Sequence, residues 1–218
     1  MPRAALSQSQ VDAFRESLCT HATRLFAEQG YEGVTMRALA QSLGCSPMTP
    51  YRYFENKEEI FDAVRAAAAD RFADALEERI QGLSEHGERL RALTEAYVAF
   101  ALAEPHAYRI IFELDQGERS PESMASEIRG WNVMYSAVEA AIRAGFLRGE
   151  APILAHLLWS GVHGLVALHL AGKLTLGHEL PELVEALIER SLEQAGAGST
   201  SATRLESLRR VDESTSRH

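Results

Sequence analysis

Residues 35–54 read TMRALAQSLGCSPMTPYRYF, and this stretch decides the fold of the N-terminal part of the chain. Apolar residues recur at helical spacing in its first half, and Gly44 ends that pattern. Ser46-Pro47 then opens a second helix, because serine caps helices and proline suits their first turn. The stretch therefore predicts two short helices, at 36–43 and 47–53, in the helix-turn-helix plan. The second helix of this plan enters the major groove of DNA.

Pro50 lies inside the second of these helices. It has no N–H and removes the first regular helical hydrogen bond, from residue 50 back to residue 46. We therefore expect the start of this helix to be loosened or tightened toward a 3₁₀ turn. Its exposed face is expected to carry Thr49, Arg52 and Tyr53, with Tyr51 toward the edge, and these side chains suit phosphate oxygens and base edges.

The rest of the chain predicts an all-α fold, because almost every apolar segment has a helical period. Further helices are expected over residues 7–30, 56–80, 88–103, 106–114, 121–145, 151–173 and 181–195. We divide the chain into a helix-turn-helix head (1–60), a helical ligand-binding and dimerisation body (61–195) and a disordered tail (196–218).

Charge and composition are consistent with a cytoplasmic protein in which one short segment binds DNA. The 218 residues carry a net charge of −9, but the acidic excess belongs to the body. Residues 33–57 contain three basic residues, Arg37, Arg52 and Lys57, and one acidic residue, Glu55. The net charge of this segment is therefore +2. Two cysteines are too few for a disulfide framework. The apolar segment 151–172 is nearly long enough to span a bilayer, but its three histidines favour a buried helix over a membrane span.

Motifs for catalysis are missing from the sequence. It has no Gly-rich dinucleotide fingerprint, no paired-histidine metal motif and no nucleophile elbow. We therefore expect no catalytic residues, no metal and no cofactor. A helical protein-interaction module without specific DNA binding remains the alternative to a DNA-binding regulator.

Several motifs resemble those of the TetR family of transcriptional regulators. They are Gly30-Tyr31, Thr35 to Ala40, Gly44-Cys45-Ser46, Thr49 with Tyr51 to Phe54, and Asn56 to Ile60. The resemblance implies that Thr49, Tyr51, Arg52 and Tyr53 stand on the recognition helix. It also implies that Arg37 reads a base or binds a phosphate, and that Thr35 and Lys57 contact phosphates. Pro50 departs from the family pattern and puts base contacts at Met48 in doubt.

The segment Trp159 to Val166 resembles the WHG-type C-terminal domain of some TetR-family regulators, which implies a ligand-sensing and dimerising body. Small residues at Gly161, Gly164, Ala167 and Ala171 would let the partner subunit's helix approach closely. A second apolar stripe would complete a four-helix homodimer interface, and its members are Leu183, Leu187, Ile188 and Leu192. The alternative is that both stripes pack inside one subunit.

A ligand pocket needs apolar walls with a few polar groups. The candidates are Tyr97, Phe100, Phe112, Trp131, Tyr135, Trp159 and His163, although each could equally be plain core. We expect an unknown small-molecule effector that is neutral or cationic and partly planar, unless Arg109, Arg129 or Arg143 faces the pocket. Binding of this effector would release the protein from its double-stranded DNA operator. We expect the operator to be a pseudo-palindrome that the heads of the two subunits contact.

Overall fold

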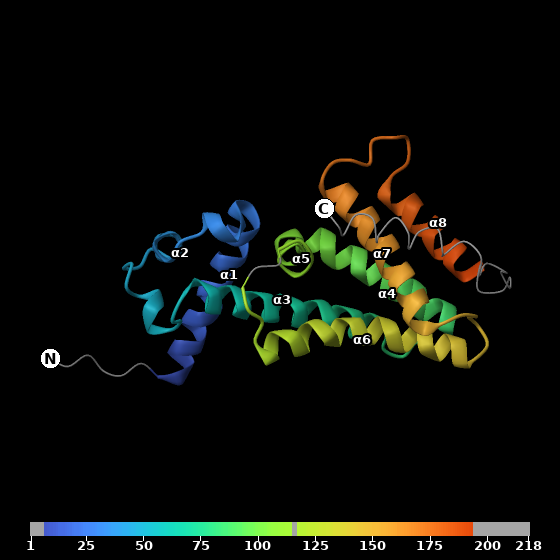
Figure 1. Ribbon diagram of the computed structural model, residues 1–218, viewed down its shortest axis with the longest axis horizontal. Coiled ribbons are helices and arrows are strands. Elements are labelled where there is room, and N and C mark those ends of the chain that lie inside the picture. Colours follow the sequence, from blue (N-terminus) through green and yellow to red (C-terminus); the bar gives the residue numbers. More distant parts are fainter. Residues whose placement is uncertain (1–6, 115–116, 194–218) are drawn as a thin grey trace, which may run out of the picture.

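A computed structural model describes residues 7–114 and 117–193 of the chain, and all the regular elements of that part are helices (Figure 1). It contains α1 (Gln8–Gly33), α2 (Met36–Ser42), the 3₁₀ helix η1 (Pro50–Arg52), α3 (Lys57–Ile80), α4 (His86–Ala103), α5 (Pro105–Phe112), α6 (Pro121–Arg143), α7 (Ala151–Leu170) and α8 (Leu180–Glu193). The prediction of an all-α fold is confirmed. The tail from residue 196 lies outside the described residues.

Side-chain caps set the helix starts in the head. The Thr35 hydroxyl accepts a hydrogen bond from the Ala38 amide at 3.1 Å, and the Asn56 side chain accepts one from the Glu59 amide at 2.8 Å. These bonds satisfy amides that have no partner within the helix. Gly30 has a φ of 73° and kinks the chain, but helical structure resumes and continues to Gly33. The continuous helix therefore breaks at Gly30, as the sequence predicts, and a short helical turn follows it to Gly33.

The long helix α3 joins the head to the body without a break. Its first turns contribute Ile60, Phe61 and Val64 to the core of the head, together with residues of α1 and α2. The rest of α3 runs alongside α6 (Figure 1), and the pair packs against α4 in the core of the body. Helix α7 contacts α4, α6 and α8.

One short helix of the body belongs to both cores. On α5, Ile110 is fully buried in the head core, whereas the neighbouring Tyr108 is fully buried in the body core. The Arg109 guanidinium on the same helix donates a hydrogen bond to the Ala27 carbonyl of α1 at 2.6 Å. Helix α5 therefore ties the body to the head.

Candidate nucleic-acid interface and body cavity

The second helix of the helix-turn-helix is not the α-helix expected over residues 47–53. Residues 47–49 form turns, and only Pro50–Arg52 is helical, with 3₁₀ geometry. The Thr49 amide bonds the Ser46 carbonyl at 2.8 Å and the Arg52 amide bonds the Thr49 carbonyl at 3.1 Å, both over three residues. Pro50 has no amide to donate over four residues, so the tightening expected from the sequence is confirmed.

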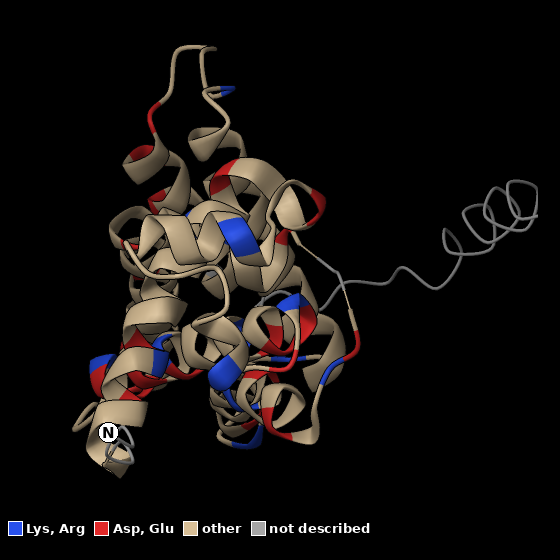
Figure 2. Ribbon diagram, turned by 90° about the vertical axis from the view of Figure 1, so that its left-hand side faces the viewer, with Lys and Arg blue, Asp and Glu red and all other residues tan. Residues whose placement is uncertain are grey.

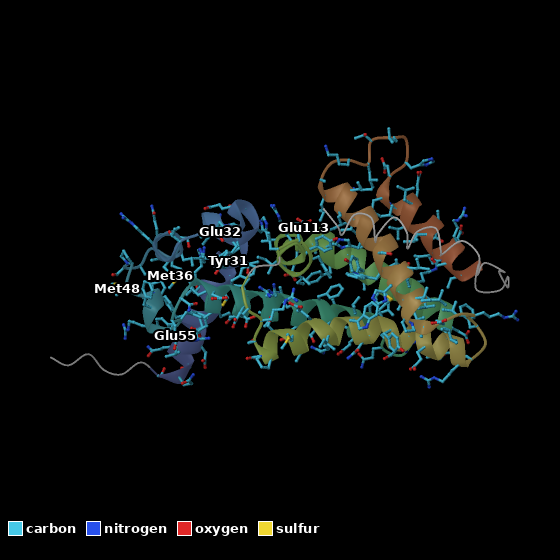
Figure 3. The ribbon with its side chains drawn as sticks, viewed as in Figure 1. Tyr31, Glu32, Met36, Met48, Glu55 and Glu113 are labelled. Carbon is cyan, nitrogen blue, oxygen red and sulfur yellow. The ribbon has the colours of Figure 1, made fainter. Side chains whose placement is uncertain are left out.

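Five residues of this recognition segment (residues 46–54) are exposed, and the three with large side chains are Met48, Tyr51 and Arg52. Met48 is 68% and Tyr51 is 49% accessible, and Arg52 is also exposed. Met48 lies at the end of the head that points away from α7 and α8 (Figure 3). The recognition segment therefore exposes the apolar side chain of Met48, the phenol of Tyr51 and the guanidinium of Arg52 to a binding partner. Sequence reasoning left Met48 out of the candidate residues, although its position beside Pro47 favours exposure.

Tyr53 does not lie on the exposed face where it was predicted. Its ring stacks on Phe14 of α1, with centroids 4.1 Å apart and planes 22° apart. The Arg15 guanidinium donates to the Tyr53 carbonyl and sits 4.0 Å above the Phe54 ring. Tyr53 is thus half-buried and holds the segment against α1 through Arg15, which lies 38 positions earlier in the sequence, and its neighbour Phe14. Sequence reasoning missed both Phe14 and Arg15.

The other predicted DNA contacts divide into exposed and half-buried side chains. Arg37 and Thr35 are exposed at the start of α2, whereas Thr49 is half-buried. The Lys57 ammonium donates to the Tyr31 carbonyl at 2.8 Å and lies 4.0 Å above the Tyr31 ring. Lys57 remains at the first turn of α3, beside amides that suit a phosphate. Viewed from the head end, Lys and Arg alternate with Asp and Glu rather than forming one basic surface (Figure 2).

The body contains a cavity of about 390 Å³ that is walled by α3, α4, α5, α6 and α7. Four of the seven predicted pocket residues line it: Tyr97, Phe112, Trp131 and Trp159. Phe72 completes the aromatic wall, with its ring edge-on to Tyr97 at 5.3 Å and to Phe112 at 5.5 Å. The volume is at the lower end of the range of about 300–1,000 Å³ that is typical of small-molecule sites.

The other three predicted pocket residues do not line this cavity. His163 lies behind the wall, where its Nδ1 is 3.0 Å from the Tyr97 hydroxyl and 2.8 Å from the Tyr108 hydroxyl. Burial lowers the pKa of His163, and it raises the pKa of Tyr108 to about 12, so this cluster is neutral near pH 7. Phe100 packs in the core against Phe72, and Tyr135 lies beside Trp131.

Three polar residues outside the seven predicted pocket residues also line the cavity. Ser126 and Glu127 come from α6, and His156 comes from α7. A glutamate or histidine on a long helix is usually part of a solvated face, so no local pattern marks these residues. Arg109, Arg129 and Arg143 are engaged elsewhere: Arg129 bonds Asp74 and Glu77 on α3, and Arg143 pairs with Glu139.

The outer face of α7 is apolar and exposed. Ile153, Leu157 and Leu168 are 54%, 61% and 47% accessible. A side chain at Gly164 would meet no other atom within 4 Å, but one at Gly161 would come within 2.9 Å of Leu187 on α8. The predicted small-residue stripe is therefore split, since Gly161 packs inside the subunit, whereas Gly164 has open space beside it and Ala171 is exposed.

Helix α7 is also long and apolar enough to cross a bilayer by length and composition, with a mean hydropathy of 1.5 over its most apolar window. Only 22% of that window is buried. Within one subunit α7 therefore leaves an apolar face exposed.

Comparison with known protein families matches two regions of the chain. Residues 18–64 match the family described as bacterial regulatory proteins, tetR family. Residues 90–194 match the family described as tetracyclin repressor-like, C-terminal domain, and this region includes the Trp159 to Val166 motif.

Relatives of similar length are DNA-binding regulators. The transcriptional activator FasR of Mycolicibacterium smegmatis is 25% identical over 190 residues, covering 86% of this chain and 83% of FasR. The transcriptional repressor AcnR of Corynebacterium efficiens is 28% identical over 193 residues, covering 81% and 93%. Among solved structures, a TetR-family regulator from Marinobacter aquaeolei VT8 shares the fold with a TM-score of 0.70 at 23% identity, covering 86% and 97%. The chain belongs to the TetR family of DNA-binding transcriptional regulators.

Proposed function

We propose that the protein is a cytoplasmic homodimeric repressor that binds a pseudo-palindromic operator and is released by a small molecule in the body cavity. The observation that carries the proposal is the double role of α5. Phe112 stands in the cavity wall, and Ile110 on the same helix is buried in the head core. A ligand that shifts α5 would therefore change the head, and it would favour a conformer with a different head separation.

The outer face of α7 supports the homodimer. An exposed apolar stripe at Ile153, Leu157 and Leu168 is costly in a monomer, and Gly164 between them allows a second helix to approach closely. A second copy using the same face would give a two-fold symmetric interface. The two heads would then meet successive major grooves about 34–36 Å apart.

Leu168→Glu is expected to convert the dimer to a monomer, because the new carboxylate would be buried without a partner at the subunit interface. Light scattering would give the mass, and a mobility-shift assay would show operator binding weakened by about tenfold or more. The matched control is Leu102→Glu on α4, since Leu102 is 45% exposed and Leu168 is 47% exposed. A Leu168→Glu dimer with normal affinity would move the interface away from this face.

Selection of bound genomic fragments would identify the operator. A mobility shift of this DNA at modest salt would separate a regulator from an interaction module that has lost DNA binding.

On the selected operator, Arg52→Ala is expected to weaken the binding free energy by about 1–3 kcal/mol and to reduce the sequence preference at one base position, because a guanidinium reads guanine through two hydrogen bonds.

Lys57→Ala provides the comparison for Arg52. It is expected to weaken all sequences alike, as loss of a phosphate contact does. Equal, sequence-independent losses in both variants would reject base reading by Arg52.

A further inference from the structure

Glu127 is the one acidic residue among the described residues that line the cavity. Its Oε1 is buried and lies 3.9 Å from Nε of Arg65 and 3.5 Å from Nε of Arg119. Arg65 itself is only 1% exposed, and neither arginine lines the cavity. Both ion pairs use Oε1, and 23% of the Glu127 side chain stays accessible. Glu127 thus lines the cavity and keeps accessible surface for a ligand.

His156 presents a second acceptor at the same cavity. Its Nδ1 lies 2.7 Å from the Pro152 carbonyl oxygen, which accepts hydrogen bonds and never donates them. Nδ1 must therefore carry the proton, so Nε2 of the neutral imidazole has a lone pair and no hydrogen. The ring lies against Trp131, with centroids 4.4 Å apart.

The two hydroxyl groups of the described lining, on Ser126 and Tyr97, already form hydrogen bonds within the protein. Ser126 donates to the Glu122 carbonyl at 3.2 Å, which leaves only the lone pairs of its oxygen for a ligand. The Tyr97 hydroxyl is engaged with His163. None of the described lining residues is Lys or Arg, and the indole N–H of Trp159 is engaged with the Tyr97 hydroxyl. The side-chain donor left in the described lining is the neutral indole N–H of Trp131.

We infer that the cavity binds a flat, mainly apolar molecule carrying a cationic or N–H donor group, and that Glu127 selects it. The polar groups of the cavity are hydrogen-bond acceptors, so a ligand with hydrogen-bond donors can pair with them. A buried acceptor without a donor lowers the affinity, because it has lost its hydrogen bond to water. The aromatic walls add to this preference, because ring faces stack on planar molecules and attract cations. The inference concerns the ligand class and rests on the proposed function only for the link to DNA release.

The test uses three probes on one aromatic scaffold: naphthylmethylamine, naphthylmethanol and naphthoate. Their binding to the full-length protein is measured by calorimetry and by the rise in thermal unfolding temperature. Naphthylmethylamine, a cation at pH 7, is expected to bind about tenfold more tightly than the alcohol, with naphthoate weakest. If naphthoate binds best, or if none of the probes binds, the inference is overturned.

Two variants locate the selectivity. Glu127→Gln is expected to lower the affinity for the amine about tenfold and to leave the affinity for the alcohol within about twofold. The control is Glu139→Gln on the same helix, which makes the same change of net charge away from the cavity, at a residue paired with Arg143. An equal effect of both variants would assign the preference to the overall negative field and overturn the role of Glu127.

His156→Phe is the second variant, because Glu127→Gln also removes a partner of Arg65 and could unfold the protein. It keeps an aromatic ring beside Trp131 and removes the Nε2 acceptor together with the Nδ1–H bond to the Pro152 carbonyl, so it should reduce the preference for the amine over the alcohol. An unchanged preference would overturn the acceptor role of His156.

Operator binding separates this inference from the proposed function. If the protein binds its operator but prefers the anionic probe, the proposed regulatory function stands and the inferred ligand class is overturned. If the protein prefers the amine but binds no DNA, the inferred ligand class stands and the proposed regulatory function is overturned.

Discussion

Phe61→Ala is expected to lower the free energy of unfolding by about 3–5 kcal/mol, as large-to-small substitutions of buried aromatic residues do. Phe61 is 0% exposed. Its ring meets Phe26 edge-on at 4.9 Å and Tyr31 at 5.1 Å, and the Arg65 guanidinium lies 4.8 Å from its centre. The substitution would leave a cavity at the point where α3 passes from the head into the body. Urea unfolding followed by circular dichroism measures the loss.

The control for this prediction is Phe146→Ala. Phe146 is 42% exposed, so its removal is expected to cost less than about 1 kcal/mol. If both variants lost the same stability, Phe61 would not be the centre of the head core. A loss of this size matters because a whole domain is stable by only about 5–15 kcal/mol.

Ile110→Ala is expected to cost about 2–5 kcal/mol, and most of the effect should fall on the head. Ile110 is fully buried among residues of the head although it belongs to α5. Native-state hydrogen exchange should therefore quicken in α1 and α2 more than in α6, and operator affinity should fall because the head is less often folded.

Ile128→Ala on α6 is the comparison for Ile110. Ile128 is 55% exposed and contributes little to either core, so its exchange pattern should match the wild type. Uniform loss of protection across the chain in Ile110→Ala would show that head and body unfold as one unit. In that case α5 could not move the head separately.

The sequence predicts well those features that depend on nearby residues. Helical periods place the main helices, and side-chain caps at Thr35 and Asn56 fix the starts of α2 and α3. The effect of Pro50 on the recognition segment also follows from its missing amide, because the lost hydrogen bond is local. What the sequence overestimates is the length of that helix, which contracts to three residues.

Features that depend on distant residues are predicted poorly. Tyr53 looks exposed on a helical projection, but Phe14 and Arg15 from α1 turn it into a packing residue. His163 looks like a pocket ligand because a buried imidazole needs partners, and it finds them in two tyrosine hydroxyls behind the wall. Glu127 carries no local signal, since its position at the cavity depends on how α6 crosses α3.

The chain has two tryptophans, and both stand in the wall of the body cavity, with ring centroids 6.1 Å apart. All of the indole fluorescence of the protein therefore originates at this one place. Water that leaves the cavity would shift the emission to shorter wavelengths, and an aromatic ligand stacked between the indoles would quench it. The recognition segment contains no indole, so the intrinsic emission of the unlabelled protein reports on the cavity and not directly on the bound DNA.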